Sequence, residues 1–231
     1  MNRVILSAST DETILAVTRQ HKLVDLEIEQ QINTEIVGCI YKGVVKNIVP
    51  AVDGIFVDIG IGKNAFLRRK DLLNEKRFPT EGSPILAQVI KSDTDMKGAL
   101  ITEKINMFGK YAVTLSGTGY IGVSKKIRQE SVRKKLKEIG KEICAEHMGL
   151  IIRTAAENAD MDEFRKDITR LKENWDIIQK RFRMEKSPTL LYRESDIIVK
   201  ALRDYVNKGT EILITDNRKI YERICKLNES E

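Results

Sequence analysis

Residues 41–67 read YKGVVKNIVPAVDGIFVDIGIGKNAFL, and this stretch decides the fold. Within GIFVDIG, the aliphatic Ile55 and Val57 alternate with Phe56. A strand sends alternate side chains to opposite faces, so burying the aliphatic residues turns Phe56 toward solvent, and Phe66 obeys the same rule. Two phenylalanines on the wet face of a small barrel form a platform on which nucleic-acid bases can stack. An ordinary strand with a solvent-exposed aromatic is the competing interpretation.

The composition is that of a globular protein with a modest positive charge. The 231 residues are 42% hydrophobic, enough for one large or two ordinary domains. Lys and Arg number 40 against 34 Asp and Glu, and the net charge of +6 permits a polyanionic partner without demanding one. Cys39, Cys144 and Cys225 form no CxxC pair, which indicates reduced thiols. With no signal-peptide core and no apolar stretch of membrane-spanning length, we expect a soluble, cytoplasmic protein.

Two β-rich segments open the chain. Residues 3–30 contain three strand-like runs, RVILSAS, TILAVTRQ and KLVDLEIEQ, separated by turn residues. Residues 36–105 predict five short strands with Gly, Pro and Asp breakers between them, which favours an OB-type barrel. These strands are expected near residues 37–48, 54–59, 64–67, 84–92 and 98–105.

Helices and strands follow in the second half. Residues 108–123 predict a β-hairpin with a turn at Ser116 and Gly117, and Ser131 is expected to cap a helix with a basic face. That face suits either a polyanion or plain solvation. MGLIIRT predicts a strand, and the next helix carries an apolar stripe in which Trp175 is expected to be a core residue. The stripe comprises Phe164, Ile168, Leu171, Trp175 and Ile178.

The last segment predicts a helix, a strand and a second helix. Asp196 is expected to cap the first helix, Gly209 to end it, and Asp216 with Asn217 to start the second. The strand between them reads EILITD. These elements can share one core with the strands at residues 3–30, and the segments between would then be insertions.

In order along nearly the whole chain, the sequence resembles the N-terminal portion of the RNase E/G family of bacterial endoribonucleases. Residues 41–67 are similar to that family's S-one RNA-binding domain, GLIIRTAA to its five-prime-end sensor, and ESDIIVKALRDYVNKGTEILITDN to its RNase-H-like segment. The resemblance implies an α+β fold in which an OB-type barrel and an α/β sensor region interrupt a discontinuous RNase-H-like domain. The implied domains are residues 1–35 with 190–231, 36–107 for the barrel, and 108–189 for the sensor.

The resemblance also implies roles for individual residues. Phe56 and Phe66 match the two aromatics that hold RNA on the barrel, and Lys97 matches a lysine of the same surface. Arg153 and Thr154 match the pair that grips a five-prime monophosphate, where a guanidinium can fork onto phosphate oxygens. Basic residues near that pocket correspond to Lys125 or Lys126, and which of them contacts phosphate stays open.

The chain departs from the family pattern at three places. Ala65 stands where glycine is usual, which would limit the backbone at a positive φ. Arg68 is more charged than the usual residue, so the run from Arg68 to Lys70 is expected either to extend the basic surface or to be solvated. The sensor segment reads AENAD in place of a glycine-containing turn.

No catalytic residue is expected in this chain. In the family, magnesium held by two aspartates supports hydrolysis and a zinc link joins subunits, and both features follow the RNase-H-like segment. The chain ends at Glu231, before either, so oligomerisation is not expected without the zinc link. The remaining acids and histidines are assigned to turns, caps, strand faces and the surface. They are Asp25, Asp58, Asp93, Asp95, Asp160, Asp162, His21 and His147.

We therefore expect the RNA-binding and five-prime-monophosphate-sensing portion of an RNase E/G-type endoribonuclease acting in rRNA processing and mRNA decay. Its expected partner is single-stranded RNA, preferably with a five-prime monophosphate. A stand-alone regulatory RNA-binding protein without nuclease activity is the main alternative. An active nuclease with an unrecognised site is a third, and whether the chain itself is an enzyme stays open.

Overall fold

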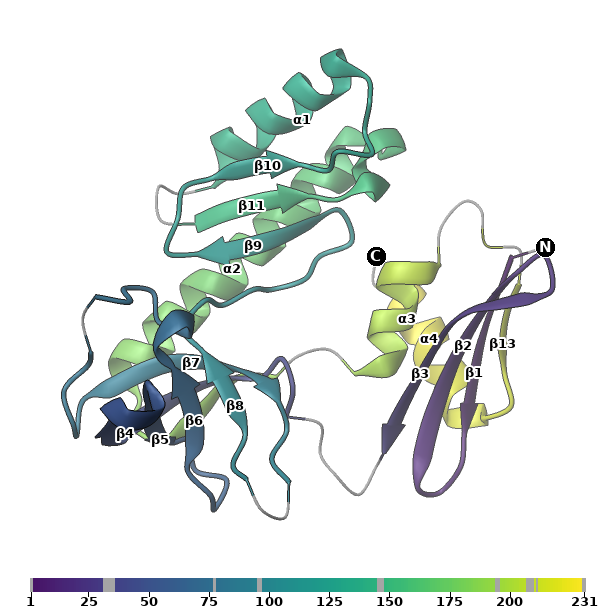
Figure 1. Ribbon diagram of the computed structural model, residues 1–231. Coiled ribbons are helices and arrows are strands. Elements are labelled where there is room, and N and C mark those ends of the chain that lie inside the picture. The colour runs from purple at the N-terminus through teal and green to yellow at the C-terminus, as the bar shows by residue number, and fades with distance from the viewer. Residues whose placement is uncertain are drawn as a thin grey trace. The chain divides into compact units, whose positions relative to one another are not determined.

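The computed structural model describes residues 2–30, 36–76, 78–94, 97–144, 148–193, 196–206, 210 and 212–229 (Figure 1). Asp95, His147 and the expected helix end at Gly209 lie outside these residues. The chain forms two compact units, one of residues 1–35 with 195–231 and the other of residues 36–194.

The smaller unit has a four-stranded sheet in the order β13-β1-β2-β3. Its strands are β1 (Asn2–Ala8), β2 (Glu12–Arg19), β3 (Lys22–Gln30) and β13 (Ile212–Thr215). Gln20 and His21 both have positive φ, the conformation that lets a two-residue turn follow the twist of its strands. His21 is exposed there, as expected.

Two helices, α3 (Ile197–Tyr205) and α4 (Arg218–Glu229), supply the rest of this unit's core. As predicted, the Asp196 side chain accepts from the Val199 amide and caps α3. Asn217 accepts from the second and third amides of α4. Asp216 instead accepts from the Ser7 hydroxyl and the Ala8 amide, which joins the end of β13 to the parallel strand β1.

Asp25 is not on an exposed strand face, contrary to the prediction. It is half-buried and accepts a hydrogen bond from the Tyr205 hydroxyl of α3. Burial raises the pKa of the Tyr205 hydroxyl, and the hydrogen bond to Asp25 is the next largest cause in the same direction. The carboxylate thus serves helix-to-sheet packing.

The larger unit begins with a closed barrel of five strands in the order β4-β5-β6-β8-β7, with β7 pairing back onto β4. The strands are β4 (Ile40–Val49), β5 (Gly54–Asp58), β6 (Ala65–Arg68), β7 (Pro84–Lys91) and β8 (Leu100–Thr102). Short 3-10 turns η1 (Pro50–Val52) and η2 (Arg69–Asp71) follow β4 and β6. The aliphatic residues of the predicted alternation line the barrel core, and the OB-type expectation is confirmed.

Strand β12 (Thr189–Tyr192) pairs antiparallel with β4. Residues 190–194 therefore belong to the larger unit, and not to the discontinuous domain in which the sequence analysis placed them. Backbone pairing decides this boundary, because β4 extends beyond the end of β5 and offers its edge to another strand.

A second sheet follows the barrel, in the order β10-β11-β9. Its strands are β9 (Ala112–Ser116), β10 (Ile121–Val123) and β11 (Met148–Ile152). The hairpin predicted over residues 108–123 is wrong, because β11 lies between β9 and β10. The run MGLII is apolar throughout, as suits a central strand, whereas the edge strand β9 (AVTLS) also contains polar residues.

Helices α1 (Glu130–Ile143) and α2 (Met161–Met184) bury their apolar sides against this sheet. The predicted stripe of α2 is confirmed, and Trp175 packs against the core cluster. Ser131 does not cap α1: the N-cap is Gln129, without a side-chain cap bond. Asp160, by contrast, caps α2 by accepting from the amides of Asp162 and Glu163.

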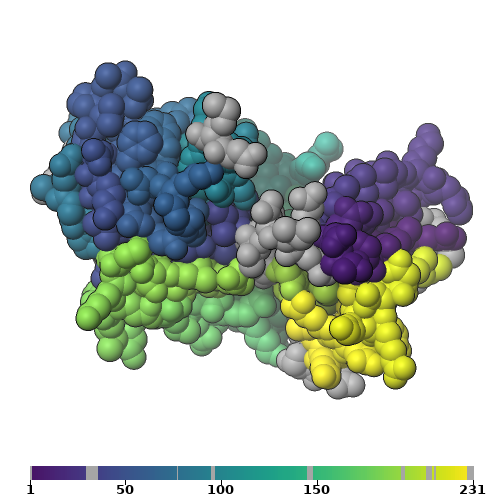
Figure 2. Space-filling model, turned by 90° about the horizontal axis from the view of Figure 1, so that it is seen from below, coloured from purple at the N-terminus to yellow at the C-terminus, as the bar shows by residue number. Residues whose placement is uncertain are grey.

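The long α2 also reaches the barrel, as its green atoms beside the blue barrel show in Figure 2. The Lys42 amine lies 5.1 Å from the Phe182 ring centroid and donates to the Glu185 carbonyl at 2.6 Å. Arg181 donates to the carbonyls of Leu190 and Leu191 in β12. One helix thus contacts both layers of the larger unit.

Candidate nucleic-acid interface

The two predicted phenylalanines lie side by side on the outer face of the barrel. Phe56 of β5 pairs directly with Phe66 of β6, and both are half-exposed while their chain neighbours are buried. The ring centroids are 5.4 Å apart, with 52° between the ring planes. The geometry leaves two adjacent apolar surfaces open to a ligand.

Gly54 makes room for this pair. A Cβ on Gly54 would lie 2.3 Å from each of two carbons of the Phe66 ring. The ring therefore occupies space that only a glycine leaves open.

Charged and polar side chains surround the aromatic pair. Asn47 of β4 lies opposite Phe56, and the neighbouring Lys46 is exposed with its amine 3.4 Å from the Asp58 carboxylate. Asp58 thus faces outward, as predicted, and also accepts from the Gly60 amide. Arg68 follows two residues after Phe66, held by Asp71 at 2.5 Å.

Lys97 is exposed in the turn before β8. Its amide contacts the carbonyl and hydroxyl of Thr94, and the next residue, Gly98, lies against the start of β6. A Cβ on Gly98 would come within 1.9 Å of the Asn64 carbonyl oxygen, and the Phe66 amide donates to Ala99 at 2.7 Å. These contacts bring Lys97 toward the strand that carries Phe66.

The departures from the family pattern have local explanations. Ala65 is a buried strand residue paired with Val57 and does not have positive φ. Arg69 contacts two neighbours: its guanidinium carbon lies 4.1 Å from the Phe78 ring centroid, and its Nε lies 2.9 Å from the Asp53 carboxylate. AENAD falls largely in a 3-10 turn, η3 (Thr154–Asn158).

A second group of predicted residues meets where β10 and β11 end. Arg153 follows β11, and its guanidinium donates to the Gly109 carbonyl at 2.9 Å. The Thr154 hydroxyl lies 2.9 Å from the hydroxyl of Ser124, which follows β10. Lys125 and Lys126, both exposed, come next in the chain.

The comparisons with known proteins bear on both groups. The family described as Ribonuclease E/G matches residues 106–231, and the S1 RNA binding domain, the S-one domain named above, matches residues 34–102. This chain belongs to the ribonuclease E/G family. It contains an S-one RNA-binding domain, whose barrel carries Phe56 and Phe66.

Curated relatives of the ribonuclease E/G family align with nearly the whole chain. Ribonuclease G of Escherichia coli strain K12 is 32% identical over 96% of this chain and 49% of its own length. Ribonuclease G of Haemophilus influenzae is 30% identical over 98% of this chain and 50% of its own length. Ribonuclease E of Buchnera aphidicola (subspecies Schizaphis graminum) is 31% identical over 96% of this chain and 25% of its own length. The chain spans about half the length of the ribonuclease G relatives it matches.

Sequence reasoning missed two residues that build the second group. Ser124 joins the ends of β10 and β11 through Thr154, and nothing in the local sequence marks that contact. Asp167 is buried on α2 and accepts from the amides of Lys110 and Tyr111 at 3.2 and 2.8 Å, beside the Gly109 carbonyl that Arg153 contacts. Its position beside the apolar stripe of α2 could have predicted this role, because a buried carboxylate needs hydrogen-bond donors.

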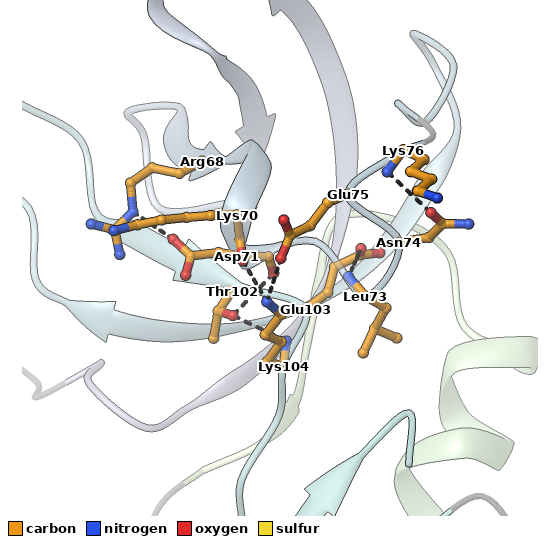
Figure 3. Close-up of polar contacts among 10 residues, drawn as sticks. All are labelled: Arg68, Lys70, Asp71, Leu73, Asn74, Glu75, Lys76, Thr102, Glu103 and Lys104. Carbon is orange, nitrogen blue, oxygen red and sulfur yellow. Dashed lines mark hydrogen bonds and ion pairs between the residues drawn. The ribbon is translucent and has the colours of Figure 1, made fainter.

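A polar network links the turn after β6 to the end of β8 in the barrel (Figure 3), and Ser116 extends it to the second sheet. Glu103 accepts from the Leu73 amide at 2.9 Å, and its backbone amide donates to the Asp71 carbonyl at 2.9 Å. The Ser116 hydroxyl at the end of β9 donates to the Glu103 carbonyl at 3.2 Å. Burial raises the pKa of the Glu103 carboxyl group. The turn after β6, the end of β8 and the end of β9 are thereby connected.

No three His, Cys, Asp or Glu side chains among the described residues form a group that could hold a metal ion. Within the same residues, no helix is both long enough and apolar enough to cross a membrane.

Proposed function

We propose that this chain is the RNA-recognition portion of an RNase E/G-type endoribonuclease acting in RNA processing and decay. It holds single-stranded RNA on the S-one barrel and recognises a five-prime monophosphate at the ends of β10 and β11. Membership of the ribonuclease E/G family supports the proposal. The observation that carries it is the pair of half-exposed rings, 5.4 Å apart, on the S-one domain.

The aromatic pair suits single-stranded RNA. Every base has a π-face, so stacking on aromatics is tolerant of sequence and contributes about 1–3 kcal/mol per base. The exposed Lys97 and Lys46 add positive charge along the path of the phosphates. Phe56, Phe66 and Lys97 form the proposed RNA-binding set.

The second group suits a terminal phosphate. A guanidinium and two adjacent hydroxyls can donate to several phosphate oxygens, and a monophosphate adds charge that a hydroxyl end lacks. Arg153, Thr154 and Ser124 supply these donors, and Lys125 and Lys126 supply the surrounding charge. The hydrogen bond from Arg153 to the Gly109 carbonyl orients the guanidinium group.

Magnesium, which the family resemblance implies for hydrolysis, is assigned to none of the described residues, because no carboxylate set among them has the required convergence. The proposed chemistry of this chain is binding. Hydrolysis is proposed for the whole enzyme.

The platform is tested by measuring the affinity of the chain for a single-stranded RNA oligonucleotide. Phe56→Ala and Phe66→Ala are each expected to weaken binding about tenfold, because each removes a stacking surface. Tyr221→Ala, which removes an exposed ring from the smaller unit, is the matched control. Unchanged affinity in both phenylalanine variants would overturn the platform.

A further inference from the structure

No helix among the described residues covers one face of the sheet β10-β11-β9. Leu150 and Ile152 of β11 point into the core shared with α1 and α2, and Ile151 between them is 40% exposed. In Figure 1, α2 passes behind this sheet. The free face is bordered by the ends of β10 and β11, where Ser124 and Arg153 lie.

A row of apolar and aromatic residues crosses this free face. Ile151 pairs with Gly122 on one side and with Val113 on the other, and Val113 pairs with Phe108. Residues opposite one another in a sheet share a face, and neighbouring strands are about 4.8 Å apart, so the row spans roughly 14 Å. Its far end, Phe108, is 43% exposed.

Tyr120 covers the other end of the row. A Cβ on Gly122 would lie 2.8 Å from a carbon of the Tyr120 ring, so the ring rests on that glycine on the free face. The side chain is 63% exposed. Two exposed aromatics thus stand at opposite ends of an apolar strip.

The strip is continuous with the proposed phosphate pocket. Ser124 and Arg153 each follow a residue of the row by two positions, Gly122 and Ile151, and alternation sends them to the same face about 7 Å along the strands. Arg153 also contacts the Gly109 carbonyl, next to Phe108. The pocket and the strip therefore form two adjacent rows of one surface.

Charge at this border favours a polyanion over a protein partner. Lys125, Lys126 and Arg128 are exposed, and the ion pairs found within the described residues do not include them. An apolar strip with aromatic ends beside such a cluster matches single-stranded nucleic acid, whose bases stack while its phosphates meet the cations.

We propose that the strip from Tyr120 to Phe108 binds the bases of the first nucleotides of an RNA whose five-prime phosphate occupies the pocket. The inference rests on the proposed function and deepens it. The site then recognises a phosphorylated nucleotide end together with its bases. A phosphate without bases behind it binds more weakly.

The test compares three single-stranded RNA oligonucleotides of one length. The first has a five-prime monophosphate, the second has the same phosphate but no bases on its first two nucleotides, and the third has a five-prime hydroxyl and all its bases. Fluorescence anisotropy gives each affinity for the 231-residue chain. We expect the wild type to bind the first about tenfold more tightly than the second.

The double variant Tyr120→Ala, Phe108→Ala should lose most of this preference for bases while still preferring phosphate to hydroxyl. Both side chains are exposed, and thermal unfolding checks that the variant is folded. Tyr221→Ala, an exposed tyrosine of the smaller unit, should retain both preferences.

Three results would overturn the inference, and they are distinguishable. Equal wild-type affinities for the first and second oligonucleotides, with phosphate still preferred to hydroxyl, would reject the strip and leave the phosphate pocket standing. Equal affinities for phosphate and hydroxyl ends would reject the pocket and the strip with it. A double variant that keeps the wild-type preference for bases would show that Tyr120 and Phe108 do not bind RNA.

Discussion

The ring of Phe66 lies where a side chain on Gly54 would be, with two ring carbons 2.3 Å from the position of a Cβ. The tilted pair with Phe56 depends on that space. A residue without a side chain is thus as much a part of the aromatic face as the rings themselves. The same holds at Gly98, whose close approach to Asn64 sets the turn that follows Lys97.

Gly54→Ala is therefore expected to weaken RNA binding several-fold, because the new methyl group displaces the Phe66 ring. Anisotropy with a single-stranded oligonucleotide measures the effect. Gly82→Ala is the control: a methyl there meets open space, and its positive φ costs stability without touching the rings. An alanine at position 54 that leaves affinity at the wild-type value would contradict the packing argument.

The raised pKa of Glu103 predicts that the stability of the fold depends on pH. Burial raises its pKa above the ordinary 4.5, so the folded chain holds this proton more tightly than the unfolded chain does. Its contribution to stability is then greatest at low pH and falls as the pH rises through the raised pKa. Relative to Glu103→Gln, the thermal midpoint of the wild type should fall as the pH rises above 4.5. Parallel midpoints across that range would contradict the assignment.

At the scale of elements, α2 supports the residues of the proposed phosphate pocket from the core side. Its buried Asp167 accepts from two consecutive amides of the turn after Gly109, and a Cβ on Gly109 would lie 2.4 Å from that carboxylate. The Gly109 carbonyl then receives Arg153. A helix buried in the core thus fixes the orientation of a guanidinium at the surface.

Asp167→Ala should lower the free energy of unfolding by roughly 2–4 kcal/mol, because it leaves the buried Tyr111 amide and the partly buried Lys110 amide without this acceptor. It should also reduce the preference for a five-prime phosphate. Asp176→Ala on the same helix, which breaks only an exposed pair with Lys172, should cost under about 1 kcal/mol and leave RNA binding intact. Denaturant unfolding of both variants checks the difference, and equal losses would contradict the role given to Asp167.

The order of strands shows where sequence reasoning stops. Alternation and breakers predicted the barrel strands and the faces of Phe56 and Phe66 correctly, since both depend on local pattern. The hairpin over residues 108–123 failed because the residues that separate β9 from β10 lie farther along the chain, at 148–152. Local pattern shows where strands are and does not show which strand lies between two others.

The candidate site divides in the same way. The aromatic pair followed from alternation, whereas Lys97, Arg153 and Thr154 rested on the family resemblance. Ser124 required the structure, because its partner Thr154 is 30 residues away and on another strand. Ser131 failed as a helix cap because α1 begins at Glu130.

At the scale of the whole molecule, both proposed RNA contacts belong to the larger unit, residues 36–194. The S-one barrel and the second sheet are joined by α2 and by the network around Glu103. A single RNA molecule that contacts both surfaces would bind more tightly than one that contacts either alone, since the second contact forms at high effective concentration.

The most direct test of the account is the ratio of affinities for one RNA sequence with a five-prime monophosphate and with a five-prime hydroxyl. For the wild type we predict a ratio of about ten or more, because charge-assisted hydrogen bonds to phosphate are lost with the hydroxyl. For Arg153→Ala the ratio should approach one, with affinity for the hydroxyl end unchanged. Arg165→Ala, an exposed arginine of α2 paired with Glu142, should keep the wild-type ratio. A wild-type ratio of one, or a ratio that survives the loss of Arg153, would contradict the account.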